Sequence, residues 1–385
     1  MLYVSTLFDL QRDSRPLFTA TYDTITKSVQ FFPLYLPKTG KTIYEIEQNK
    51  QAVAQIIHGQ HEVCLNDYKQ HLIGFDLDSL NIDCVYDYPC LMRTTLDLVE
   101  LKKTLLKQVK SMQAMGRQKW AHIRGNAAPV YKQLQQRGVY FGYDKVHPIW
   151  HMDVYSGRTR TEGFNIQGLQ DDDPIASVNG HDTFVCLDWV AADFRMASIM
   201  SGDQKLAGSF DVSDPYEFMA SAKNDPEVTR SSVKGELFKS LYSMDCWSNG
   251  MLFYKGLGQW MQQKREQIEA TGKMESILDR VFEVSDERSI LSAFNAGIQG
   301  SIAHAMQRVI RGAWEICPMN LLIENHDSLI LTFKKTDKCR HIISDVADIM
   351  CHPFRGILEA DPIFPVVVSI GSKYKLWRKF KRYDG

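Results

Sequence analysis

The spacing of apolar residues predicts four main helices. Residues 96–136 carry leucines and a valine at helical intervals, and they include a lysine cluster with no acid between positions 101 and 119. Three further segments have a helical pattern: residues 191–201, 226–246 and 294–316. Asp225 and Pro226 supply the expected start of the 226–246 helix, because proline is favoured in the first helical turn.

Short apolar runs predict the strands of a core sheet. Residues 182–190 have the pattern of a buried strand that carries Asp188 near its end. Residues 319–333 contain two apolar runs separated by Asn325-His326-Asp327, which is typical of a β-hairpin. A last strand over residues 364–371 precedes a tail rich in lysine and arginine.

Composition excludes several classes of protein. With 44% hydrophobic and 24% charged residues in a chain of 385, a substantial core is expected rather than disorder. No apolar run approaches the roughly 20 residues of a membrane span, and the first residues do not resemble a signal peptide. The eight cysteines have irregular spacing without a C-x-x-C pair, which predicts buried free thiols in a reducing compartment.

Two acids stand where core strands end. Asp188 closes the 182–190 strand, and Asp327 lies at the tip of the predicted hairpin. Two carboxylates held face to face repel each other unless a cation lies between them, and Mg²⁺ is the hard divalent cation suited to oxygen ligands. A pair of such ions would suit a phosphoryl displacement. Spacing alone leaves a second interpretation open, in which both are unrelated turn residues.

The predicted helix after Pro226 carries a second pattern. Arg230, Lys234, Phe238 and Tyr242 follow one another at intervals of four and form one stripe along the helix. Cations bind phosphates and rings stack on bases, so this stripe suits a nucleotide. An ordinary amphipathic helix with both rings in the core fits the same spacing.

These two patterns occur within a series of segments that resembles the family A DNA polymerases, the group of bacterial DNA polymerase I and many phage replicative enzymes. The stripe resembles motif B (RxxxKxxxFxxxY), the run from Asp188 to Asp203 resembles motif A, and His326-Asp327-Ser328 resembles motif C. Similar matches occur at residues 156–167 (TGR…PNLQ), at residues 295–300 (NxxxQG) and in the final segment from Asp361 onward. The segments follow the family's order over residues 151–385.

The resemblance implies an α+β right-hand fold with an antiparallel palm sheet, helical fingers and a reduced helical thumb. The expected domains are an N-terminal α/β region (1–95), the thumb (96–150), the palm (151–213 and 286–385) and the fingers (214–285). The implied activity is template-directed addition of dNTPs to a primer 3′-OH, with two Mg²⁺ ions as cofactors. Primer–template DNA and dNTPs are the implied partners, together with a processivity or replisome protein that would compensate for the short thumb.

The resemblance also implies roles for individual residues. Asp188 and Asp327 would be catalytic and would bind both metal ions. The nucleotide would contact Arg230 and Lys234 through its phosphates, Phe238 through its sugar and base, and Tyr242 beside the nascent pair. Asp193 would exclude a ribose 2′-OH. The residues expected to contact DNA are Arg158, Asn165, Gln167, Asn295, Gln299 and His326.

Several positions depart from the family pattern. Asp193 stands in place of the motif A glutamate and is one methylene shorter, so a leaky ribose exclusion is expected. Ser328 replaces the glutamate of motif C, Leu291 an arginine, Ser243 a glycine and His304 an aspartate. The histidine usual after motif A has two candidate replacements, Tyr216 and Glu217.

Two alternative functions and one alternative domain remain open. A single-subunit RNA polymerase-like enzyme also shares His-Asp-Ser, although such enzymes have glycine where Asp193 stands and methionine where Phe238 stands. The second alternative function is that of an inactive polymerase fold that serves as a replisome scaffold. Residues 1–95 are interpreted as an inactive remnant of a 3′–5′ exonuclease, or else as an unrelated domain. The expected location is cytoplasmic, in a bacterial host if a phage encodes the chain.

Overall fold

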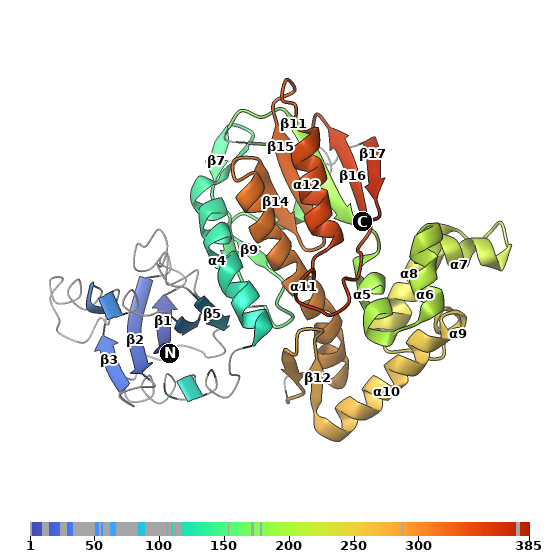
Figure 1. Ribbon diagram of the computed structural model, residues 1–385, viewed down its shortest axis with the longest axis horizontal. Helices are drawn as coiled ribbons and strands as arrows, with labels where there is room; N and C mark the ends of the chain where they lie inside the picture. Colours follow the sequence, from blue (N-terminus) through green and yellow to red (C-terminus); the bar gives the residue numbers. More distant parts are fainter. Residues whose placement is uncertain are drawn as a thin grey trace. The chain divides into compact units, whose positions relative to one another are not determined.

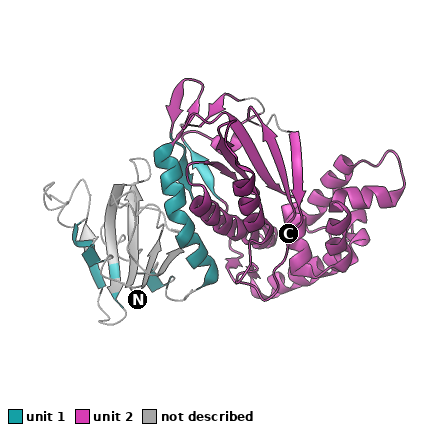
Figure 2. Ribbon diagram, turned by 45° about the horizontal axis from the view of Figure 1, so that its top comes forward, with its two compact units in different colours: residues 1–137, 147–154, 159–162 teal, residues 138–146, 155–158, 163–385 magenta. Residues whose placement is uncertain are grey.

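The computed structural model shows two compact units, drawn in different colours in Figure 2. One comprises residues 1–137, 147–154 and 159–162, and the other residues 138–146, 155–158 and 163–385. The structure describes the following residues: 2–9, 15–23, 29–33, 51–53, 55–56, 62–66, 84–88, 106, 109–110, 112, 118–152, 154–170, 173–177, 179–286, 288–374 and 378–385.

The first unit contains a mixed five-stranded sheet in the order β3-β2-β1-β4-β5. Its strands are β1 (Leu2–Asp9), β2 (Arg15–Asp23), β3 (Val29–Pro33), β4 (Glu62–Asn66) and β5 (Cys84–Tyr88). The pairs β1–β2 and β2–β3 are antiparallel, whereas β1–β4 and β4–β5 are parallel. The same unit holds α4 (Lys119–Arg137) and the short pair β8 (Ile149–His151) and β9 (Arg160–Glu162). Most of the lysine cluster of residues 101–119 lies outside the described residues.

The second unit is built around an antiparallel sheet in the order β14-β15-β11-β16-β17 (Figure 1). Its strands are β11 (Thr183–Trp189), β14 (Leu321–Asn325), β15 (Ser328–Phe333), β16 (Val366–Gly371) and β17 (Arg378–Tyr383). Continuous apolar runs in β11 and β15 put both strands in the core, since side chains on both faces of a central strand are covered. The expected mixture of helices with an antiparallel sheet is therefore confirmed.

The helices of this unit form two groups. In Figure 1, α11 (Ile290–Ile316) and α12 (Arg340–Cys351) lie on one face of it and pack against each other. The other helices follow β11 in sequence: α5 (Ala192–Ser201), α6 (Gln204–Val212), α7 (Pro215–Lys223), α8 (Arg230–Tyr242), α9 (Asn249–Phe253) and α10 (Lys255–Thr271). Small elements complete the unit: β6 (Val139–Phe141), β7 (Asp144–Val146), the 3-10 helix η1 (Ile166–Gly168), β10 (Ile175–Ala176), β12 (Lys273–Glu275) and β13 (Val281–Glu283).

Three predicted helix ends were wrong. The helix expected over 294–316 begins at Ile290, because Ser289 caps it by accepting from Ser292 N. The helix expected over 226–246 begins at Arg230, because Asp225 forms a local turn by accepting from Glu227 N at 2.9 Å while Thr229 caps the helix. It ends at Tyr242, two residues before Met244 takes a left-handed conformation. The basic tail contains the additional strand β17. Its side chains are mostly exposed, as in an edge strand, so it lacks the apolar pattern by which strands are found.

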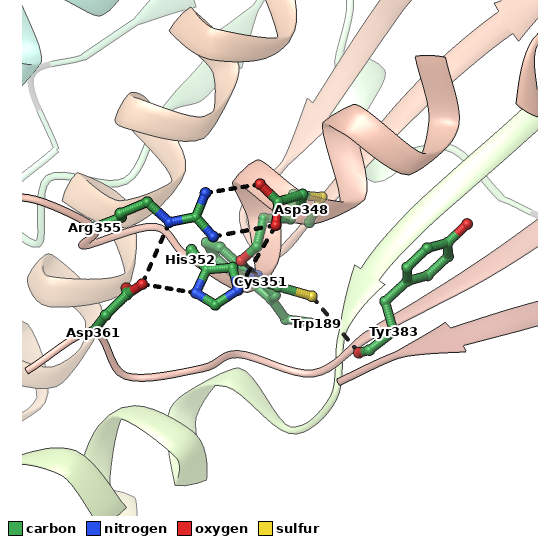
Figure 3. A network of polar contacts seen from close by, with 8 residues as sticks. Trp189, Asp348, Cys351, His352, Arg355, Asp361 and Tyr383 are labelled. Atoms are coloured by element: carbon green, nitrogen blue, oxygen red, sulfur yellow. Dashed lines mark hydrogen bonds and ion pairs between the residues drawn. The ribbon is translucent and has the colours of Figure 1, made fainter. Parts of the chain in front are cut away.

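A polar network holds the segment between α12 and β16 (Figure 3). Arg355 donates to both carboxylate oxygens of Asp348, at 2.9 and 3.2 Å, and to Asp361 at 3.4 Å. His352 contacts the same Asp361 at 2.9 Å. Nearby, the indole of Trp189 donates to the Met350 carbonyl at 2.8 Å, so the end of β11 is attached to α12.

Two further expectations from the sequence concern free cysteines and membrane-spanning helices. Among the described residues, Cys186, Cys246, Cys317, Cys339 and Cys351 are free thiols, and all except Cys339 are buried. Within the same part of the chain, no helix combines the length and the apolar character that crossing a membrane requires.

Glycine allows a close approach at one point of α11. A Cβ at Gly300 would lie 2.5 Å from the Phe282 ring and 3.0 Å from the Ser156 carbonyl oxygen. Gly208 in α6 has no atom within 4 Å of the same position. We expect Gly300→Ala to lower the free energy of unfolding by about 1–3 kcal/mol through overpacking. Gly208→Ala should raise it by up to about 1 kcal/mol through helix propensity. Urea denaturation checks both, and equal effects would contradict the packing.

The network at Arg355 predicts a pH dependence of stability. The hydrogen bond from Arg355 lowers the pKa of Asp348 below its ordinary value. Because the pKa is lower in the folded state, the ionised carboxylate stabilises the protein at pH values above about 3.9, the ordinary pKa of aspartate. This stabilisation is lost as the pH falls below that value and through the lowered pKa of the folded state.

We expect Asp348→Asn to cost up to about 1 kcal/mol at pH 7, a small value because the pair is half exposed. The difference from the parent should shrink as the pH is lowered below about 4. Thermal melts over pH 3–7, with the exposed Asp345→Asn as control, test this. A difference that is constant with pH would contradict the ion pair.

Candidate active site

Strand pairing brings the two predicted acids together. Asp188 of β11 pairs with Ser328, the residue after Asp327, and Trp189 N donates to the Asp327 carbonyl at 3.1 Å. The two-residue turn between β14 and β15 requires a left-handed conformation at His326, with φ 58°. The fold therefore places two carboxylates on adjacent chain segments at one end of the central strands.

Burial and the charges of nearby side chains set the electrostatics of these acids. Burial raises the pKa of Asp188 above the ordinary aspartate value, and the charge of Asp327 raises it further. Burial also raises the pKa of Asp327, followed by the charge of Asp193. Lys234 opposes both shifts. Asp188 nevertheless remains accessible to solvent, and Asp327 is partly exposed, so a ligand has access to the pair.

Such a pair has the donor chemistry of a divalent cation site. The carboxylates are hard oxygen ligands, and their mutual repulsion is relieved by a cation. Among the described residues, no group of three or more histidine, cysteine, aspartate or glutamate side chains gathers at a single point. Asp188 and Asp327 thus fit Mg²⁺ as protein ligands that leave further positions to other oxygen donors.

A third acid, Asp193, lies in the first turn of α5 and is 8% exposed. Its carboxylate accepts a short hydrogen bond from the Tyr242 hydroxyl and contacts Arg158 at 3.4 Å. Burial, followed by the charge of Asp193, raises the pKa of Tyr242, so its hydroxyl stays protonated and can donate. These contacts connect α5, α8 and the loop that contains Arg158.

The stripe on α8 has the predicted order. Arg230 and Lys234 are exposed at its N-terminal end, while Phe238 and Tyr242 are partly buried and stack with ring centroids 5.9 Å apart. Phe238 also meets Phe194 of α5 edge-on at 5.5 Å. The aromatic half of the stripe fixes α8 against α5. The two cations remain open to solvent, and Lys234 acts electrostatically on the two acids.

The residues expected to contact DNA have different surroundings. Asn295 donates to the Tyr242 carbonyl at 3.2 Å, and Gln299 lies within hydrogen-bonding reach of the Tyr242 hydroxyl, so these two join the cluster around Asp193. Gln167 donates to the Glu324 carbonyl at 3.3 Å. Asn165 caps η1 by accepting from Gly168 N at 3.1 Å.

His326 is held in the turn beside Asp327. Its backbone N–H donates to the Glu324 carboxylate at 2.7 Å. Burial, followed by the positive charge of Arg158, lowers the pKa of His326 to about 4, so the ring is neutral at neutral pH. Within the described residues, its Nδ1 is buried without a hydrogen-bond partner. A neutral ring is suited to hydrogen bonding rather than to charge pairing.

Sequence reasoning missed some residues that build the site. Glu324 is 2% exposed and supports His326, and the available signal was a single acid within an apolar strand. Asp214 accepts from Arg230 Nε at 2.8 Å, and its signal was the Asp-Pro pair that begins α7. Of the two replacements for the family's histidine, Tyr216 is 1% exposed, whereas Glu217 is exposed to solvent.

The likeness of this chain to known proteins lies in its structure rather than in its sequence. The sequence matches no family model and no curated protein. The structure is similar to the POL domain of Pol1 from M. smegmatis, which was solved in complex with a DNA primer–template and a dNTP. The TM-score is 0.62, with 14% sequence identity, and the match covers 97% of this chain and 95% of that chain. This likeness shows that the chain has the fold of a DNA polymerase domain.

Proposed function

We propose that the chain is a template-directed DNA polymerase that adds dNTPs to a primer 3′-OH. The observation that carries the proposal is the convergence of Asp188, Asp327 and Lys234: two carboxylates on adjacent chain segments, with the charge of a lysine from a separate helix acting on both. The fold shared with a polymerase domain supports it. In the terms of the proposal, the palm comprises residues 151–213 and 286–385, the fingers residues 214–285 and the reduced thumb residues 96–150.

The residues have distinct roles in the proposed reaction. The primer oxygen attacks the α-phosphorus of the dNTP, the bond to the β-phosphate breaks, and pyrophosphate leaves. Asp188 and Asp327 would hold two Mg²⁺ ions, which supply charge neutralisation at the attacking and leaving oxygens. Arg230 and Lys234 bind the triphosphate and stabilise the charge that develops on it. Phe238 packs against the sugar and base.

Asp193 and its partners define the sugar side of the proposed site. The carboxylate is fixed by Tyr242 and Arg158, so it has little freedom to move away from an added hydroxyl. Tyr242, Asn295 and Gln299 form one hydrogen-bonded cluster beside it, where the nascent base pair and the minor groove would lie. Acceptors common to all base pairs in the minor groove would let this cluster test pair shape without reading sequence.

Other parts of the proposal rest on the sequence. Residues 1–95 would lack proofreading activity, because the segment at residues 19–28 has no paired acids of the kind a two-metal exonuclease needs. Arg158, Asn165, Gln167 and His326 would contact the primer–template. A reduced thumb would make a processivity or replisome partner useful. The proposed location remains the cytoplasm.

Replacing either of the two aspartates proposed to bind Mg²⁺ should abolish nucleotide incorporation. We expect Asp188→Asn and Asp327→Asn each to lower the rate of primer extension with Mg²⁺ and dNTPs by at least about 100-fold, since the remaining carboxylate cannot hold the ions alone. Asp345→Asn, an exposed acid on α12, should leave the rate unchanged. An inactive parent protein would favour the scaffold alternative, and an active Asp327→Asn variant would refute the metal ligands.

Asp193 should control the choice between dNTPs and rNTPs. We expect Asp193→Ala to raise the ratio of ATP to dATP incorporation by about ten-fold, because the carboxylate no longer opposes a 2′-OH. Asp193→Glu, which restores the longer acid, should lower that ratio below the parent's. Single-nucleotide kcat/KM values measure this. A ratio that is the same in all three proteins would contradict the role, and a parent that prefers ATP would favour the RNA polymerase alternative.

A further inference from the structure

One buried ring lies beneath both cations of α8. Tyr216, the second residue of α7, is 1% exposed. The Arg230 guanidinium carbon is 5.2 Å from the centre of its ring, and Lys234 Nζ is 6.0 Å from the same centre. The first distance is within the range of cation–π attraction and the second is at its limit of about 6 Å. Lys234 Nζ also lies 5.7 Å from the centre of the Phe238 ring. A single aromatic residue therefore contacts the two side chains to which the proposed function gives the triphosphate.

The ring is fixed in place by its surroundings. Phe194 meets it edge-on at 5.6 Å, and Phe238 lies at 6.1 Å. The Asp214 carboxylate accepts from Tyr216 N and Glu217 N, both at 2.9 Å, which caps α7 directly before the ring. The Tyr254 hydroxyl donates to the Pro215 carbonyl at 2.7 Å. Tyr216 thus has little freedom to move when the cations above it change their partners.

An aromatic face suits this position better than a carboxylate would. A carboxylate would pair with the cations and neutralise them, whereas a ring attracts a cation and leaves its charge available to a second partner. Asp214 pairs with Arg230 through Nε at 2.8 Å, and the arginine side chain remains 48% exposed. Within the described residues the Tyr216 hydroxyl is buried without a hydrogen-bond partner, so the hydroxyl does not account for the residue's position.

We propose that Tyr216 is a positioning residue for the incoming triphosphate, and that its ring holds the side chains of Arg230 and Lys234 in place for the phosphates. This inference rests on the proposed function, in which those two cations bind the phosphates. According to this inference, Tyr216 affects the binding of the substrate's phosphate chain rather than the binding of its base or sugar.

The test uses inorganic tripolyphosphate, which carries the phosphate chain without base or sugar. Its binding to the full chain is measured by calorimetry without divalent cations, so that only side-chain cations contribute. We expect Tyr216→Leu to weaken binding by about ten-fold, as expected for the loss of two cation–π contacts. Tyr216→Phe keeps the ring and should bind like the parent. Phe218→Leu is the matched control, because Phe218 lies on the same helix but its ring packs on Phe253 rather than beneath the two cations. This variant should also bind tripolyphosphate like the parent.

Kinetics separate positioning from a general loss of structure. In primer extension, Tyr216→Leu should raise the KM for dNTPs by a similar factor with a smaller change in kcat, and Tyr216→Phe should restore the parent KM. Equal tripolyphosphate binding by Tyr216→Leu and the parent would overturn the inference. A loss shared with Phe218→Leu, or a parent that does not bind tripolyphosphate, would overturn it as well. If the parent binds tripolyphosphate but extends no primer, the proposed polymerase activity is refuted. The binding of tripolyphosphate to the Tyr216 variants would then decide by itself whether Tyr216 positions the two cations.

Discussion

The pairing of β11 with β15 forces two like charges together, and much of the second unit is arranged around that constraint. Carboxylates cost free energy when water is partly excluded, and burial is the first cause of the raised pKa of each acid. A neighbouring carboxylate adds to each shift, Asp327 for Asp188 and Asp193 for Asp327. The fold counters this cost with Arg158 and Lys234, which come from a loop and from α8 rather than from the sheet. Charge balance at the acids therefore depends on elements that approach the sheet from separate parts of the sequence.

A chain of aromatic rings connects those elements. Tyr216 of α7, Phe194 of α5, and Phe238 and Tyr242 of α8 have successive centroid distances between 5.5 and 5.9 Å. Aromatic contacts of this kind bury large areas with defined geometry. They place Lys234 of α8 where its charge acts on the two acids, while Arg230 at the same end of the helix pairs with Asp214. The hydrogen bond between Tyr242 and Asp193 then joins this apolar cluster to the polar one around Asn295.

The sequence predicted the parts of this arrangement that local patterns control. Apolar runs identified β11, β14, β15 and β16, and the intervals of four in α8 placed its cations and rings on one stripe. Adjacent strands also follow from a hairpin signature, so the position of Asp327 was predictable. The proximity of Asp188 to it required the resemblance to known polymerases, because nothing local specifies which strand pairs with the hairpin.

What sequence reasoning missed depends on tertiary contacts. The role of Asp214 arises only when α7 lies beside α8, and a charged edge strand such as β17 has no apolar alternation to reveal it. The sequence offered Tyr216 and Glu217 as alternatives, and only the contacts of Tyr216 with two cationic neighbours in the structure distinguish it.

The last described strand has a mechanical consequence. Arg382 of β17 donates to the carbonyls of Phe210 and Ser213, both at 2.6 Å, and so it binds the C-terminal end of α6 to the edge of the sheet. Asp214, which caps α7 and holds Arg230, is the next residue along the chain. The strand at the opposite edge of the sheet from β14 therefore anchors the chain directly before the residue that holds Arg230.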